Sequence, residues 1–250
     1  MQEAGDWFVV TEPRPDAVLT ILAFPNSGGG CAAFARHARL MPDWLATATL
    51  NLPGRQARFG EPLLTDVDEL TSELAQWCSR QGGPFLFFGY CSGALLAYNV
   101  ARVLHARDAT LPSRLIVGSF QPPDRVRMPP LAGLSSDDLW RVLTEHQAVP
   151  ATLAQHAELR KLSEPAIRAD FALVSGYRHV AAPRLPVPIT VLAGQHDRWL
   201  RDEDLASWAD FTSAGLSVSR LPTGHWFMEE DPAASVAALI SQAQAECLEC

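Results

Sequence analysis

A Gly-x-Cys-x-Gly motif lies between a continuous apolar run and a helical pattern near the middle of the chain. The apolar run is Phe85–Tyr90, and the motif consists of Cys91 flanked by Gly89 and Gly93. This order of strand, turn and helix is typical of a nucleophile elbow, which exposes the nucleophile at a helix N-terminus. The glycines fit because strand and helix backbones approach too closely there for most side chains. A buried cysteine in an ordinary turn would give the same motif, so its partner residues decide.

Length and charge limit the function classes. The chain has 250 residues, enough for one domain with a sizeable core. It carries 20 basic and 28 acidic residues, a net charge of −8. Phosphate recognition depends on clustered Lys and Arg, so no nucleic-acid partner is expected. The N-terminus does not resemble a signal peptide, and no apolar run approaches the roughly 20 residues of a membrane helix. We therefore expect a cytoplasmic protein with no membrane partner.

The cysteines do not indicate a disulfide framework or a metal site. There are five, an odd number, and their spacing is irregular. Cys247 and Cys250 form a Cys-x-x-Cys pair at the end of the sequence, but no second pair of ligands accompanies them. We expect no metal ion to be bound.

Strand and helix patterns alternate along the chain. Strands are expected at 17–24, 46–50, 85–90, 114–120, 187–192 and 216–221. Helices are expected at 32–40, 67–79, 92–106, 203–212 and 232–246. Such alternation is typical of the α/β class, with a mostly parallel central sheet and helices on both faces.

One long connection interrupts this alternation. Residues 122–186 are too many for a single crossover between strands, and they carry helical patterns at 135–145, 152–162 and 164–177 between proline-rich boundaries. We expect a single domain over residues 1–250, with 122–186 inserted as a helical lid over the strand ends.

A base and an orienting acid are expected at the ends of two later strands. In α/β-hydrolases the nucleophile is followed in the chain by the acid and then by the histidine. Asp197 follows the strand at 187–192, and His225 follows the strand at 216–221. His225 is the only one of the seven histidines that lies after Asp197. Asp197 alone could be a solvated loop carboxylate, but three candidates in the right order favour a Cys91-Asp197-His225 triad.

Acyl transfer also needs hydrogen-bond donors for an oxyanion. In this fold they are the backbone N–H after the nucleophile and one in the loop after an early strand. These correspond to Ser92 and, within the glycine-rich segment 24–30, to Ser27. A glycine-rich loop can also bind phosphate, but this one matches neither the P-loop nor the dinucleotide-binding pattern. We therefore predict an oxyanion hole formed by Ser27 and Ser92.

The chain resembles the discrete type II thioesterases, which are stand-alone editing enzymes of polyketide and nonribosomal peptide synthesis. The resemblance extends from about Trp7 to about Ala238. It rests on the elbow and on four further motifs at 24–29, 52–55, 194–197 and 221–227. It implies an α/β-hydrolase that releases acyl or aminoacyl groups from the phosphopantetheine of an acyl or peptidyl carrier protein, without another cofactor. It also implies that Cys91 is the nucleophile, His225 the base and Asp197 its orienter.

The chain departs from that family in two places. The family usually has Ser at the elbow, where this chain has Cys91 preceded by Tyr90, and it usually has His-Ala where this chain has Asn26-Ser27. Arg55 lies in the matching Pro-Gly-Arg segment, and either a salt bridge or a substrate contact would explain it.

The thiol widens the range of expected reactions. Attack by Cys91 on a thioester exchanges one thioester for another at nearly equal free energy, so the acyl-enzyme keeps its activation. Hydrolysis is one outcome, and transfer of the acyl group to a second carrier protein or another nucleophile is the alternative. A non-catalytic module that docks a carrier protein is a third hypothesis, which the order of the triad disfavours.

Overall fold

The computed structural model describes residues 7–127 and 131–248. The predictions made for the segment before Trp7 and for Cys250 fall outside these ranges, as does the side chain of Cys247.

The described strands form one seven-stranded sheet with the order β1-β3-β2-β4-β5-β6-β7. They are β1 (Phe8–Val10), β2 (Leu19–Phe24), β3 (Leu45–Leu50), β4 (Phe85–Tyr90), β5 (Leu115–Gly118), β6 (Ile189–Gly194) and β7 (Leu216–Leu221). Neighbouring strands are parallel except β1, which is antiparallel to β3. The predicted mostly parallel sheet is confirmed. Strand β1 was not predicted, because three residues are too few to show a periodic pattern.

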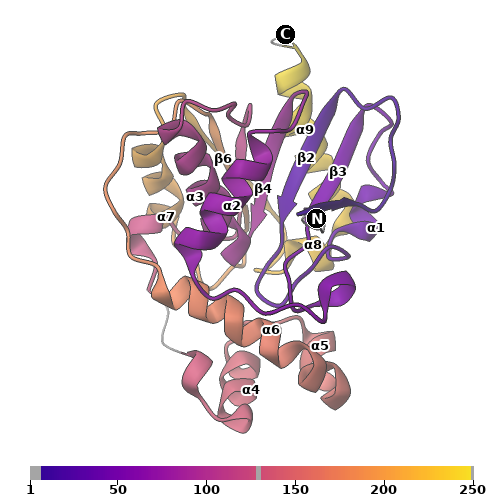
Figure 1. Ribbon diagram of the computed structural model, residues 1–250, viewed down its shortest axis with the longest axis vertical. Helices are drawn as coiled ribbons and strands as arrows, with labels where there is room; N and C mark the ends of the chain where they lie inside the picture. The colour runs from indigo at the N-terminus through magenta and orange to yellow at the C-terminus, as the bar shows by residue number, and fades with distance from the viewer. Residues whose placement is uncertain (1–6, 128–130, 249–250) are drawn as a thin grey trace.

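Helices cover both faces of this sheet (Figure 1). The helices of the sheet domain are α1 (Ala35–Ala38), α2 (Val67–Cys78), α3 (Ser92–Ala106), α7 (Asp202–Ala206), α8 (Phe227–Glu230) and α9 (Pro232–Leu248). Single-turn 3₁₀ segments occur at Gln56–Arg58, Pro123–Arg125 and Leu131–Gly133, and a longer one at Ser207–Phe211. Within the described ranges, no helix is long and apolar enough to cross a membrane.

The strands are buried on both sides because their side chains alternate between two cores. In β4, Phe85 and Phe87 pack with α2 and α3, whereas Phe88 and Tyr90 pack with the α9 side. A strand buried in this way appears in the sequence as a continuous apolar run.

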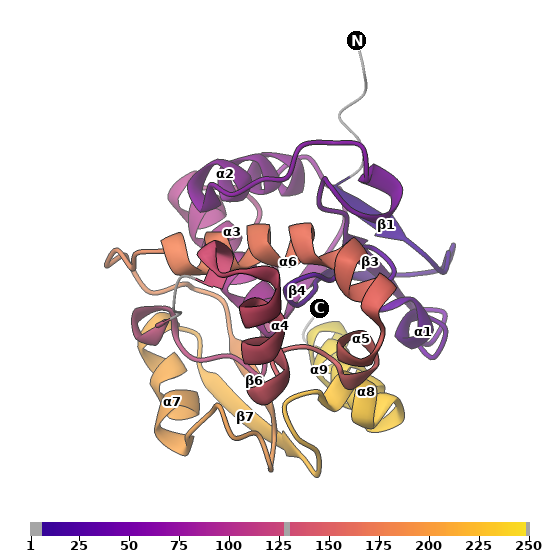
Figure 2. The same ribbon diagram turned by 90° about the horizontal axis from the view of Figure 1, so that it is seen from below.

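Three further helices lie between β5 and β6, beyond the carboxyl ends of the strands (Figures 1 and 2). They are α4 (Ser136–Glu145), α5 (Ala151–Gln155) and α6 (Ala157–Gly176), and we call them the α4–α6 segment. They have a small core of their own, which includes Leu139, Leu143, Ile167 and Phe171. The role of the α4–α6 segment as a lid stays a prediction.

The predicted break between helices at 152–162 and 164–177 is wrong, because α6 continues through Pro165. A proline removes one helical N–H donor, here the partner of the Lys161 carbonyl. Pro165 is exposed, so water can solvate that carbonyl. Burial of Ile167 and Phe171 on the opposite side favours a continuous helix.

Two helices are shorter than predicted. The pattern at 32–40 forms α-helix only over 35–38. The pattern at 203–212 divides into α7 and the 3₁₀ segment that follows it.

Candidate active site

Cys91 occupies a strained turn between β4 and α3. Its backbone has φ 52° and ψ −127°, a conformation that is unfavourable for a residue with a side chain. A Cβ atom on Gly89 would lie 2.3 Å from the Cα of Ala94, and one on Gly93 would lie 2.2 Å from the carbonyl oxygen of Phe24. Both glycines are therefore required by close backbone approach, as expected for a nucleophile elbow.

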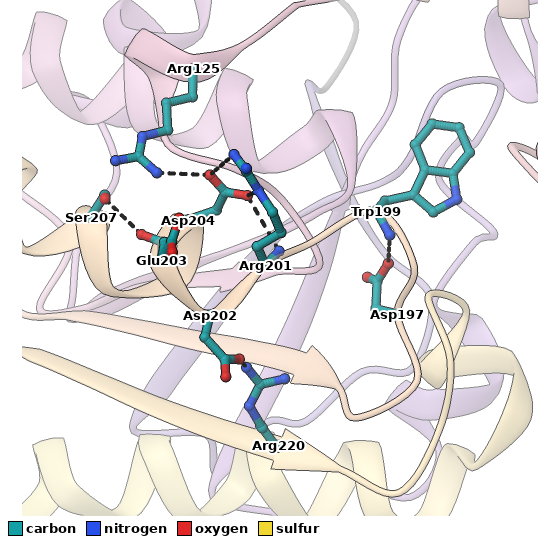
Figure 3. Close-up of polar contacts among 9 residues, drawn as sticks. All are labelled: Arg125, Asp197, Trp199, Arg201, Asp202, Glu203, Asp204, Ser207 and Arg220. Atoms are coloured by element: carbon teal, nitrogen blue, oxygen red, sulfur yellow. Dashed lines mark hydrogen bonds and ion pairs between the residues drawn. The ribbon is translucent and has the colours of Figure 1, made fainter.

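The structure brings His225 and Asp197 together. The Nδ1 of His225 lies 2.9 Å from Oδ2 of Asp197. The other carboxylate oxygen accepts a hydrogen bond from the backbone N–H of Trp199 at 2.9 Å, as Figure 3 shows. The Asp197 side chain is fully buried, and that of His225 is 13% exposed. The acid can thus orient the imidazole, with little competition from water.

Charge interactions within this group outweigh burial. Burial raises the pKa of Asp197, but hydrogen bonds from His225 and from the Trp199 N–H hold that pKa below its usual value. Burial lowers the pKa of His225. Interactions with Asp197 and Cys91 raise it by more than burial lowers it, so that the pKa is about 10. Both partners therefore favour the protonated, imidazolium form of His225. A cation beside a cysteine favours the nucleophilic thiolate.

A neighbouring ion-pair group supports the loop that carries Asp197. Asp204 in α7 accepts a hydrogen bond from Arg125 at 2.8 Å and pairs with Arg201 at 3.2 Å (Figure 3). Asp204 therefore connects the end of this loop to the segment after β5.

Tyr90 contacts the backbone of the candidate base. Its side chain is fully buried, and its hydroxyl lies 3.0 Å from the carbonyl oxygen of His225 and 3.2 Å from Oε2 of Glu229. Burial raises the pKa of Tyr90 well above its usual value, so the hydroxyl stays a donor. The sequence singled out Tyr90 only as a departure from the family motif and did not indicate this contact.

The side chains of Ser27 and Ser92 are in contact. The Ser27 hydroxyl donates to the Ser92 hydroxyl at 2.8 Å. Within the part of the chain that the structure describes, neither backbone N–H has a hydrogen-bond acceptor in the protein. Two unused donors near Cys91 are available to an incoming oxygen atom. Their assignment as oxyanion donors remains a prediction.

Arg55 forms a buried ion pair. Its Nη1 and Nη2 atoms lie 2.6 and 2.8 Å from the two carboxylate oxygens of Asp170 in α6, and both side chains are less than a tenth exposed. Of the two explanations that the sequence allowed for Arg55, the salt bridge is present. Sequence reasoning did not identify Asp170. The sequence feature that could have indicated Asp170 is that it is the one acidic residue among the buried positions of α6, which include Ala166, Ile167 and Phe171.

A small apolar cavity lies between α3 and α6. Its volume is about 40 Å³, and Ser92 and Pro25 place one end next to the elbow. Leu96 and Val174 contribute to its largely apolar wall. It is suited to a short hydrocarbon group attached near Cys91.

The residues described here contain no group of three or more His, Cys, Asp or Glu side chains arranged to hold a metal ion.

Fold and site together define a hydrolase of the α/β class that carries a cysteine at its elbow. The family model of the thioesterase domain matches residues 19–244. The chain therefore belongs to the thioesterase family, and the predicted α/β-hydrolase fold and thioester hydrolase class are confirmed.

Relatives of known sequence agree with this assignment. The human medium-chain S-acyl fatty acid synthase thioesterase is 31% identical over 229 residues, which cover 88% of this chain and 84% of that protein. The gramicidin S biosynthesis protein GrsT of Aneurinibacillus migulanus is 26% identical over 232 residues, covering 92% and 91% of the two chains.

Solved structures agree as well. The type II thioesterase BorB from the borrelidin biosynthetic cluster superposes with a TM-score of 0.86 at 25% identity, covering 94% of this chain and 96% of that chain. RedJ, a thioesterase from the prodiginine pathway of Streptomyces coelicolor, gives a TM-score of 0.84 at 26% identity, covering 94% and 87%.

Proposed function

We propose that this thioesterase cleaves acyl or aminoacyl thioesters from the phosphopantetheine of an acyl or peptidyl carrier protein in polyketide or nonribosomal peptide synthesis. A biosynthetic setting is supported by GrsT, a gramicidin S biosynthesis protein, and by BorB, a type II thioesterase from the borrelidin biosynthetic cluster. The observation that carries the chemistry is the elbow itself. Cys91 lies there at positive φ, and it raises the pKa of His225, whose imidazole is bonded to Asp197.

Acylation begins with attack by the Cys91 thiolate on the carbonyl carbon of the thioester. The carbonyl oxygen becomes an oxyanion, which accepts hydrogen bonds from the backbone N–H groups of Ser27 and Ser92. When the tetrahedral intermediate collapses, the bond to the pantetheine sulfur breaks, and that sulfur takes the proton held by His225. The products are acyl-Cys91 and free pantetheine thiol, and the imidazole is neutral.

Deacylation uses the same histidine as a base. Once Cys91 is acylated, the negative sulfur that helped to raise the pKa of His225 is absent, so this pKa falls. Neutral His225 can then take a proton from water while the water oxygen attacks the acyl carbon. Collapse releases the carboxylic acid and restores the thiolate beside the imidazolium.

Acyl transfer is the second candidate function, and the identity of residue 91 favours it. A cysteine acyl-enzyme is a thioester, so a second phosphopantetheine thiol can accept the acyl group at almost no cost in free energy. The protein would then move acyl or aminoacyl groups between carrier proteins or to another nucleophile.

The nucleophile is tested by incubating the wild type and Cys91→Ala with acyl-pantetheine and measuring intact protein mass. The wild type should gain one acyl group, and Cys91→Ala should gain none and lose turnover. Cys31→Ala and Cys78→Ala are matched controls, since both thiols are buried, and each should still form the adduct. An adduct that persists in Cys91→Ala, or that maps to another cysteine, would contradict the proposal.

The two candidate functions are separated by the fate of the acyl group. At a fixed concentration of free pantetheine thiol, hydrolysed and transferred products are quantified for the wild type and Cys91→Ser. Detectable transfer by the wild type, with a shift toward hydrolysis in Cys91→Ser, would favour the transferase. If the wild type transfers nothing, plain hydrolysis is the function.

A further inference from the structure

The α4–α6 segment is bonded to the loop that carries the predicted oxyanion donor Ser27. The backbone N–H of Gly28, the next residue, donates to Oδ2 of Asp170 in α6 at 2.7 Å. This bond fixes the peptide group on one side of Ser27. It crosses from an inserted helix to a loop of the sheet domain, 142 positions earlier in the sequence.

Arg55 completes a closed set of contacts around this loop. It binds both oxygens of Asp170, and its Nη1 also donates to the carbonyl oxygen of Gly29 at 3.0 Å. Consecutive residues of the loop are thus bonded to opposite ends of one buried ion pair. Displacing Asp170 would free the Gly28 N–H and leave Arg55 without its buried counter-charge.

Helix α6 also packs directly against the loop. Gly28 has φ +79°, and a Cβ atom there would lie 2.6 Å from Cγ1 of Ile167, one turn before Asp170. The loop therefore contacts α6 through both an apolar side chain and a carboxylate. Gly28 is required by the positive φ and by this contact.

We propose that Asp170 is a positioning residue for the oxyanion hole: from α6 it orients the loop of Ser27, so the hole is complete only when α6 is seated on the sheet domain. The inference rests on the proposed function, since it presumes that Ser27 stabilises an oxyanion. Oxyanion donors act only when they lie about 2.7–3.1 Å from the developing charge. Small displacements of reacting groups reduce rates strongly. The packing of α6 against the sheet domain would then also position the oxyanion donor.

The test removes both charges at once, because a single variant would leave a buried charge unpaired and could unfold the protein. The double variant Arg55→Met/Asp170→Leu keeps similar side-chain volumes and abolishes the bonds to Gly28 and Gly29. Two rates are measured: thioester turnover, and alkylation of Cys91 by iodoacetamide followed by peptide mapping. Alkylation is a displacement at an sp³ carbon that forms no oxyanion, so it reports on the nucleophile alone.

We expect kcat to fall by about tenfold or more, but by less than the roughly 10²–10³-fold loss that follows removal of a whole oxyanion donor. KM and the rate of Cys91 alkylation should stay within about twofold of the wild type. An unchanged kcat would overturn the proposal. A parallel loss of turnover and alkylation would also overturn it, since the defect would then lie in the nucleophile or the fold.

A matched control is available elsewhere in the molecule. Arg114 and Glu246 form a comparably buried ion pair at 2.6 Å, near the start of β5 and in α9. The variant Arg114→Met/Glu246→Leu should keep turnover within about twofold; a loss equal to that of the first double variant would overturn the proposal. Turnover by Cys91→Ala would instead refute the proposed function, which distinguishes the two failures.

Discussion

The indole N–H of Trp226 donates to the carbonyl oxygen of Gln147 at 2.8 Å. Trp226 directly follows His225, and Gln147 lies just after α4 in a left-handed conformation with φ 51°. A second contact lies nearby, where the rings of His146 and Trp199 are 6.1 Å apart and Trp199 is 6.0 Å from His225. This part of the chain therefore contacts Trp226 and Trp199, two neighbours of the candidate base, whereas Asp170 in α6 contacts the oxyanion loop.

The Trp226 bond can be removed without removing the ring. In Trp226→Phe the aromatic contacts with Tyr90 and His225 can remain, but the donor to Gln147 is lost. A neutral hydrogen bond contributes about 0.5–1.5 kcal/mol, so local opening should increase by about two- to tenfold. Amide hydrogen exchange at residues 146–149 should accelerate by that factor, while exchange in α3 stays constant. Equal exchange in both proteins would show that this bond does not restrain the segment.

The sequence was sufficient to predict which three candidate residues lie at strand ends. Cys91, Asp197 and His225 each follow a parallel strand, and parallel strands bring their carboxyl ends to one edge of the sheet. Strands β4 and β7 begin and end where their patterns predicted, because turns flank them closely. The two glycines of the elbow indicated its backbone geometry.

Contacts made by the α4–α6 segment could not be predicted. Asp170 in α6 and Gln147 in the turn after α4 belong to a segment whose apolar side chains pack in a small core of their own. Nothing in a single sequence specifies how such a segment is oriented on the sheet domain. The pairing of Asp170 with Arg55 spans 115 positions and depends wholly on that orientation.

The steric requirement at the elbow predicts a large effect on stability. In Gly93→Ala the new methyl group would lie 2.2 Å from the carbonyl oxygen of Phe24, so α3 must move away from β2. The free energy of unfolding should fall by about 2 kcal/mol or more, as expected for overpacking at a rigid site. Gly82→Ala is the control, because a Cβ there meets no atom within 4 Å, and its change should stay within about 0.5 kcal/mol. Chemical denaturation measures both, and similar values would contradict the elbow geometry.

Substitution of His225 should affect activity far more than substitution of His196, the histidine that precedes Asp197 in the sequence. His225 is bonded to Asp197, whereas His196 is exposed and its backbone N–H binds Thr223. His225→Ala should lower kcat by about 10³-fold, as for removal of a general base, and His196→Ala by less than about threefold. Steady-state kinetics with an acyl-pantetheine decide between them, and comparable losses would refute the assigned roles.

The charge state of His225 can be measured directly. Its pKa of about 10 depends on hydrogen bonds with Asp197 and Cys91 and on their negative charges. Removing a negative partner destabilises the imidazolium, so Cys91→Ala should lower this pKa, and so should Asp197→Asn. An NMR titration of the imidazole carbon-bound protons gives the value in each protein. A pKa that stays near 10 in Cys91→Ala would show that no thiolate is paired with His225.

The cavity beside Ser92 predicts the length of acyl chain that the enzyme accepts. A volume of about 40 Å³ holds roughly three atoms of the size of a water molecule. Acetyl and propionyl thioesters should therefore be turned over faster than octanoyl thioesters.

Smaller side chains in the cavity lining should allow longer acyl chains to be accepted. Leu96→Ala and Val174→Ala each remove methyl groups from the lining, and every additional substrate methylene that enters should raise kcat/KM about fourfold, from about 0.8 kcal/mol of burial. Relative to acetyl, butyryl and hexanoyl thioesters should gain most. Leu162→Ala is the control, since that side chain of α6 is exposed and its loss should leave the chain-length profile unchanged. If the folded Leu96→Ala and Val174→Ala variants kept the wild-type profile, the acyl group would have to lie outside this cavity.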